Sequence, residues 1–187
     1  MMEDKRGVRN RLIFAKQRLA DLKKLGGEEE DLGPVSETER QQPMQEFFFH
    51  LVGAIEFLAQ TVNDTRKLII DEEDVSPSTI CRKLSDGDPI KEILSKLHPQ
   101  TRGKRLPQDQ YSDDASHFRI ILLRNRVCHH GRNPFHFRRG SEPPCSLFLD
   151  PRDRQEKEGS CKPAIEELSH FWELVNYKCE QILSIDG

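Results

Sequence analysis

The sequence predicts an all-α fold: an antiparallel up-and-down helical bundle with four main helices and one short helix, and a small β-hairpin inserted before the last helix. Two observations predict it. Apolar residues recur at intervals of three and four over several long segments, which is the period of an amphipathic helix. Glycine and proline residues interrupt the chain between those segments. The 187 residues suit a single domain that buries its core without disulfide bonds or structural metals.

The first two helices are predicted from their apolar stripes. A helix over residues 9–25 has its inward positions at Leu12, Ala15, Leu19 and Leu22 and ends at Gly26-Gly27. Residues 28–42 are predicted to be a polar linker. The second helix is expected to begin at Pro43, a residue that suits a first turn, and to extend to about residue 70. It has the widest apolar stripe of the chain, formed by Phe48, Leu51, Val52, Ile55, Leu58, Ala59 and Val62.

The rest of the chain alternates loops with shorter apolar segments. Residues 71–88 are predicted to be a loop, and residues 89–97 a short helix that stops before a proline. A further helix is expected from about residue 112 to a glycine at position 131, which suits a helix C-terminus. Residues 134–150 are predicted to form the hairpin arm, and residues 162–185 the last helix.

Composition excludes several classes of protein. Only 35% of the residues are hydrophobic, and no apolar run approaches the roughly 20 residues that span a bilayer. The first residues lack the apolar stretch of a signal peptide. The chain has five cysteines, an odd number, and no CxxC pair, which argues against a disulfide framework. We therefore expect a cytoplasmic protein.

Basic residues are concentrated between positions 102 and 139, although the net charge of the chain is −3. The basic residues there are Arg102, Lys104, Arg105, Arg119, Arg124, Arg126, Arg132, Arg138 and Arg139. Such a surface can attract a polyanion such as RNA. The alternative is an ordinary solvated surface with a local bias in charge.

The strongest candidate for a functional site is residues 124–129, Arg-Asn-Arg-Val-Cys-His, at the end of the helix expected from residue 112. On an ideal α-helix, Asn125 and His129 share a face because they are four residues apart. Arg124 and His129 are separated by about 140° around the axis and about 7.5 Å along it. The two would meet only if the helix end unwound, if the arginine curled round, or across a dimer interface. Arg126 is a second candidate partner for the histidine.

These residue types suit the cleavage of a phosphodiester. A histidine can take the proton from a ribose 2′-OH at neutral pH. An arginine can hold two phosphate oxygens and stabilise the charge that develops on them. The alternative is structural, because arginine and histidine near a helix C-terminus often satisfy the last carbonyls of the helix.

The Arg124-Asn125-x-x-x-His129 pattern resembles the signature of HEPN domains (higher eukaryotes and prokaryotes nucleotide-binding), as do the flanking residues from Leu123 to Gly131. The resemblance implies that residues 1–187 form one HEPN-like helical domain of the bacterial stand-alone type. It implies a metal-independent endoribonuclease, a homodimer with two motifs in one cleft, and a toxin-antitoxin or defence setting with an antitoxin as partner. Some similar proteins are instead non-catalytic scaffolds or modules that bind nucleotides or RNA.

The resemblance also assigns roles to residues. Arg124 would stabilise the phosphate, His129 would act as the acid-base group, and Asn125 would orient one of them. We further expect contacts with RNA or phosphate from residues outside the signature or beside it, namely Arg126, His130, Arg102, Lys104 and Arg105.

No cofactor or metal is expected. The nearest cysteine and histidine cluster comprises Cys128, His129, His130, His136 and Cys145, and it lacks the ligand spacings of zinc sites. Cys128 is a weak candidate for a nucleophile and is expected to be a small packed residue.

Overall fold

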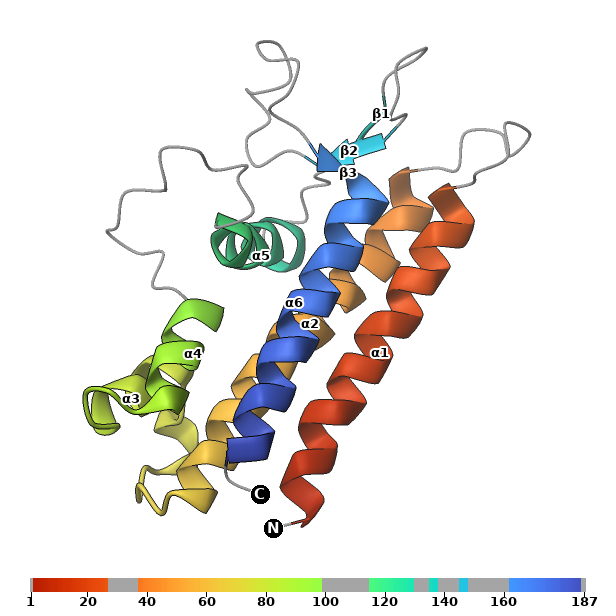
Figure 1. Ribbon diagram of the computed structural model, residues 1–187. Helices are drawn as coiled ribbons and strands as arrows, with labels where there is room; N and C mark the ends of the chain where they lie inside the picture. Colours follow the sequence, from red (N-terminus) through yellow and green to blue (C-terminus); the bar gives the residue numbers. More distant parts are fainter. Residues whose placement is uncertain are drawn as a thin grey trace.

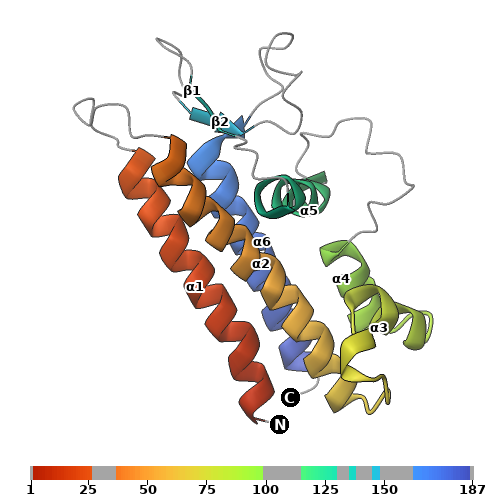
Figure 2. The ribbon, with the colours of Figure 1, turned by 180° about the vertical axis from the view of Figure 1, so that it is seen from behind.

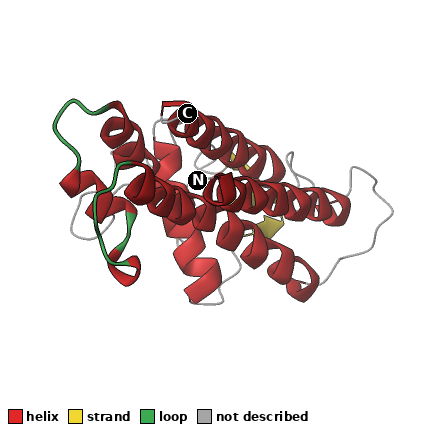
Figure 3. Cartoon of the chain, turned by 90° about the horizontal axis from the view of Figure 1, so that it is seen from below, coloured by secondary structure: helices red, strands yellow, loops and turns green. Residues whose placement is uncertain are grey.

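The computed structural model describes residues 2–26, 37–98, 115–129, 135–137, 145–147 and 162–185. These residues are mostly helical, so the all-α class is confirmed (Figure 3). The α-helices are α1 (Met2–Gly26), α2 (Glu37–Thr65), α3 (Pro77–Lys83), α4 (Pro89–Leu97), α5 (Ser116–Arg124) and α6 (Ala164–Ile185). None of these helices combines the length and the apolar character needed to cross a bilayer.

Three long helices, α1, α2 and α6, lie side by side (Figures 1 and 2). Helix α2 runs antiparallel to α1, and α6 runs in the same direction as α2, so both chain ends lie at one end of the molecule. The predicted apolar stripes of α1, α2 and α6 are the faces that meet, and their residues are buried. At the centre, the ring of Phe48 lies 5.2 Å from that of Phe47 and 6.4 Å from that of Phe171. Each buried side chain of this size stabilises the fold by roughly 1.5–3 kcal/mol.

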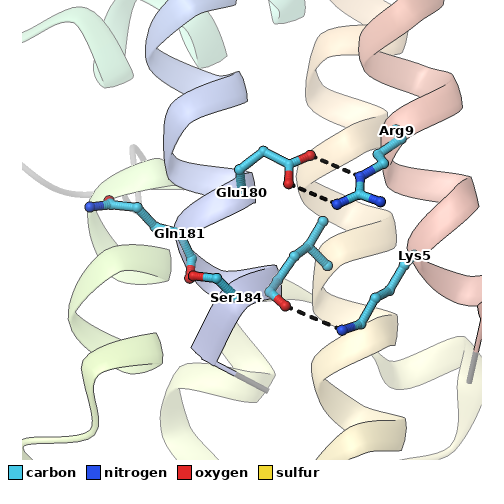
Figure 4. A network of polar contacts seen from close by, with 6 residues as sticks. Lys5, Arg9, Glu180, Gln181 and Ser184 are labelled. Atoms are coloured by element: carbon cyan, nitrogen blue, oxygen red, sulfur yellow. Dashed lines mark hydrogen bonds and ion pairs between the residues drawn. The ribbon is translucent and has the colours of Figure 1, made fainter. Parts of the chain in front are cut away.

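Polar contacts join the outer edges of α1 and α6 (Figure 4). Arg9 donates to both carboxylate oxygens of Glu180, at 3.0 and 2.9 Å, and Lys5 Nζ donates to the carbonyl of Leu183 at 3.2 Å. Solvent reaches both members of the Arg9–Glu180 pair, so the pair contributes no more than about 1 kcal/mol. The buried apolar faces hold these helices together, and the surface contacts add little to that.

Two boundaries of α2 differ from the prediction. The helix begins at Glu37, so residues 37–42 are helical rather than linker, and Pro43 lies inside it. The helix ends at Thr65 rather than near residue 70. The chain reverses after it through left-handed conformations at Lys67 and Ile69, and the Asn63 side chain bonds both backbone groups of Ile70.

The segment that was predicted to be a loop, residues 71–88, contains the short helix α3 and a 3₁₀ turn, η1 (Glu72–Asp74). Ser76 caps α3 by accepting from the backbone N–H of Thr79 at 3.2 Å, and Pro77 occupies the first turn. The prediction of α4 over residues 89–97 is confirmed, with Asp88 as its N-cap.

Helix α5 crosses the long helices instead of lying along them, and it is seen almost end-on in Figures 1 and 2. It contacts both α2 and α6, and Ile120, Ile121 and Leu123 are buried in that junction. The alternating four-helix arrangement is therefore not confirmed. The predicted start of this helix near residue 112 lies outside the described residues.

Three short strands lie at the end of α6 opposite the chain termini (Figure 1). They are β1 (Phe135–Phe137), β2 (Cys145–Leu147) and β3 (Lys162–Pro163). They pair antiparallel in the order β1-β2-β3, with Phe135 opposite Leu147. Most of the predicted arm, residues 134–150, falls outside the described residues.

A buried polar cluster joins α5 to α6. Arg119 and Glu167 are 2% and 4% exposed, and Arg119 Nε donates to Glu167 Oε1. Arg119 Nη2 also donates to Ser116 Oγ at 2.9 Å, which lies 3.2 Å from His170 Nε2. The guanidinium lies 5.7 Å from the ring of Phe171. The cluster fixes where α5 sits across α6.

We predict that Glu167→Leu destabilises the protein by about 3–5 kcal/mol, because it leaves the Arg119 charge buried without its carboxylate. The double variant Arg119→Met/Glu167→Leu should recover most of this loss, because both charges are then removed. Urea unfolding of the three proteins measures the differences. A single variant within about 1 kcal/mol of wild type would show that the pair does not anchor α5.

His117 predicts a loss of stability at acidic pH. Burial, with smaller contributions from Lys178, His170 and Lys96, lowers the pKa of His117 to about 4. Between pH values of about 6.5 and 4 the unfolded imidazole binds a proton that the folded one does not, so stability falls as the pH falls through this window. His117→Gln should therefore lose about 2 kcal/mol less than wild type between pH 7 and pH 5 in urea unfolding. Parallel pH profiles for the two proteins would contradict this assignment.

Candidate active site

The helix end at residues 124–129 is a π turn rather than an α-helical one. Helix α5 ends at Arg124 and continues as the π-helix η3 (Asn125–His129). In a π turn the backbone hydrogen bonds join residues five apart along the chain, whereas in an α turn they join residues four apart. The side chains of Arg124 and His129 are five apart, and Arg124 Nη1 lies 2.7 Å from His129 Nε2. The sequence left open three ways in which the side chains of Arg124 and His129 could meet. The structure has one of them, a helix end that is unwound.

The contact assigns the roles of the two groups in the hydrogen bond. A guanidinium has only N–H donors, so His129 Nε2 must accept the hydrogen bond. An imidazole that accepts at Nε2 carries its ring proton on Nδ1. The side chain of His129 is exposed, so a ligand can approach the ring from solvent.

Glu56 of α2 holds the other side of the guanidinium. Arg124 Nη2 donates to Glu56 Oε1 at 3.2 Å, and the two side chains are 20% and 54% exposed. The guanidinium is thus fixed between a carboxylate and an imidazole. Sequence reasoning missed Glu56, because a single acidic residue on the polar side of a long helix carries no signal beyond solvation.

A second residue of α2 holds the π turn itself. Gln45 Nε2 donates to the carbonyl of Val127 at 3.1 Å, and the Cys128 thiol donates to the carbonyl of Gln45 at 3.6 Å. Burial raises the pKa of the Cys128 thiol, and the charge of Arg124 offsets part of the shift. Cys128 is a packed thiol that supports the turn, and it does not have the character of a nucleophile.

His98, at the C-terminal end of α4, is a third side chain that sequence reasoning missed. Burial lowers the pKa of His98, and the charges of Glu56 and Arg124 act on it in opposite directions. Its Nδ1 is buried and has no hydrogen-bond partner among the described residues. The His98 imidazole therefore lies close enough to the Glu56–Arg124 pair for both charges to act on it.

The other residues predicted for the site have different outcomes. Asn125 is partly buried, and within the described part of the chain no hydrogen bond joins it to Arg124 or His129. The orienting role of Asn125 therefore stays a prediction. Arg126 is half-buried on the same turn. The remaining predicted residues lie outside the described residues: His130, Arg102, Lys104 and Arg105.

The described residues bring together a guanidinium, a neutral imidazole and a carboxylate. These groups can transfer a proton and stabilise an anion. No three histidine, cysteine, aspartate or glutamate side chains converge as candidate metal ligands in the same residues. Comparison of the chain with protein-family models, curated proteins and solved structures gives no match.

Two arginine–histidine contacts in this protein predict opposite tautomers. Arg124 donates to Nε2 of His129, whereas Arg11 Nη1 lies 3.1 Å from Nδ1 of His50 and must donate to it. At about pH 8 nitrogen NMR should find the proton on Nδ1 in His129 and on Nε2 in His50. Arg124→Met should abolish the preference of His129 alone. The same tautomer in both rings would contradict the geometry of the π turn.

Proposed function

We propose that this chain is a HEPN-like, metal-independent endoribonuclease that uses Arg124 and His129. The observation that carries the proposal is the direct contact between a guanidinium and a neutral imidazole at an exposed helix end. The proposal includes the HEPN bundle with its hairpin arm, and a cytoplasmic setting with a toxin or defence role.

His129 would act as the general base. Its neutral Nε2 takes the proton of a ribose 2′-OH, and the 2′ oxygen attacks the adjacent phosphorus. The bond from phosphorus to the 5′ oxygen breaks, and that oxygen takes a proton from water. The imidazolium of His129 then gives its proton to the hydroxide that remains, which restores both the water and the neutral base. The products are a 2′,3′-cyclic phosphate and a 5′-hydroxyl, and no water is consumed overall.

Arg124 would hold the phosphate. Incoming phosphate oxygens replace His129 Nε2 as acceptors on the guanidinium, which frees the imidazole lone pair as substrate binds. Glu56 keeps the guanidinium in place through its second terminal nitrogen, 3.2 Å from the carboxylate. Two parallel hydrogen bonds from the guanidinium suit the extra charge on the pentacoordinate phosphorus.

The two groups meet within one chain, so this site needs no second subunit to bring them together. A homodimer would place two such pairs near one RNA strand. The proposed RNA contacts are Arg126, His130, Arg102, Lys104 and Arg105. Asn125 is proposed to orient the imidazole or the phosphate, and an antitoxin is a candidate partner.

A second candidate function is a non-catalytic module that binds RNA or a nucleotide. The Arg124–Glu56 ion pair favours it, since this pair links α2 to the end of α5 and uses one side of the guanidinium for structure. In that case Arg124 would contribute to folding and to binding of an anion, and no RNA would be cleaved.

We predict that the wild-type protein cleaves single-stranded RNA in the presence of EDTA. His129→Ala should lose at least about 100-fold in rate, because it removes the general base. Arg124→Lys should lose a similar factor, because an ammonium cannot form two parallel hydrogen bonds with the phosphate. Gel analysis of labelled RNA measures the rates and identifies the cyclic phosphate ends.

The control is Tyr177→Ala, which removes an exposed side chain of α6 outside the candidate site and should cleave at the wild-type rate. Cleavage that is equal in the His129→Ala and wild-type proteins would reject the nuclease. RNA binding without cleavage by the wild type, lost in Arg124→Ala, would establish the binding module instead.

A further inference from the structure

Phe49 is an aromatic side chain of α2 that is 56% exposed. It lies four residues after Gln45 and seven before Glu56, so the three side chains share one side of the helix. Gln45 holds the π turn and Glu56 holds Arg124. Phe49 therefore lies between the two places where α2 meets the candidate site, about 10 Å along the axis from Glu56.

The ring of Phe49 is held by its neighbours. The guanidinium of Arg11, from α1, lies 4.9 Å from the ring centroid, and the same guanidinium bonds His50 at 3.1 Å. The ring of His50 is edge-on to Phe49 at 5.4 Å between centroids. A single exposed apolar residue needs no explanation. This one has a cation beside it and lies on the side of α2 that carries Glu56, the carboxylate partner of Arg124.

We infer that Phe49 is a stacking platform for a base of single-stranded RNA whose phosphate is held by Arg124. The inference rests on the proposed function and names the form of its substrate. A flat base can lie on the exposed part of the ring, and the charge of Arg11 favours the nearby phosphates. Every base has a face that stacks, so the platform selects unpaired RNA rather than a base sequence.

The test uses the full chain carrying His129→Ala, which binds RNA without cutting it. Fluorescence anisotropy measures its affinity for labelled single-stranded RNA oligonucleotides. Adding Phe49→Ala should weaken binding about 5- to 100-fold, the range for one stacked base. Phe49→Trp should preserve binding. The control Tyr177→Ala removes an aromatic residue that is 59% exposed on α6, and it should have no effect.

A second set of oligonucleotides carries one abasic nucleotide at successive positions. At the position that stacks on Phe49, the abasic oligonucleotide should bind the two proteins equally. If Phe49→Ala lowers the affinity for RNA equally at every abasic position, the inference is overturned. It is also overturned if Phe49→Ala does not lower the affinity at all. Conversion of a dimer to a monomer by Phe49→Ala, seen by sedimentation, would also overturn it and identify the ring as a contact between two copies.

Failure of this inference is distinguishable from failure of the proposed function. If Phe49→Ala does not affect cleavage in EDTA, the nuclease proposal stands and the stacking platform is rejected. If the protein does not cleave RNA, but its binding of RNA depends on Phe49 and on one base, the stacking platform stands and the nuclease is rejected.

Discussion

Glu167 and Arg119 are two charged side chains buried where α5 crosses α6, and each is tolerated there because it neutralises the other. Apolar packing alone would let a nine-residue helix slide or rotate on the long helices beneath it. The ion pair, with Ser116 and Phe171 around the guanidinium, fixes the rotation of α5 and its position on the long helices. The position of the π turn relative to α2 follows from that placement.

One side of α2 serves the candidate site in three ways. Gln45 supports the backbone of the turn, Glu56 orients the guanidinium of Arg124, and Phe49 presents an open ring between them. The opposite side of the same helix is buried in the core. The helix that stabilises the fold most therefore also carries the supporting residues of the site, and rigid elements position reactive groups better than loops do.

The sequence predicts the helical class and the buried faces well, because the apolar stripes of α1, α2 and α6 are long and regular. It fails at α3, where only seven residues and one serine cap define the helix. Local pattern also cannot predict α5 crossing α6, which depends on a contact between Arg119 and Glu167, 48 residues apart. Arg124 and His129 are identified from the sequence, but Glu56, Gln45 and His98 are not, because each joins the site only through tertiary packing.

The π turn makes the Arg124–His129 contact depend on how the helix is wound. The carbonyl of Val127, inside the turn, accepts a hydrogen bond from the side chain of Gln45 on α2. The backbone of the turn is therefore tied to a residue of α2 that is 82 residues away in the sequence. A change at Gln45 would reach the Arg124–His129 pair through the backbone, without touching either side chain.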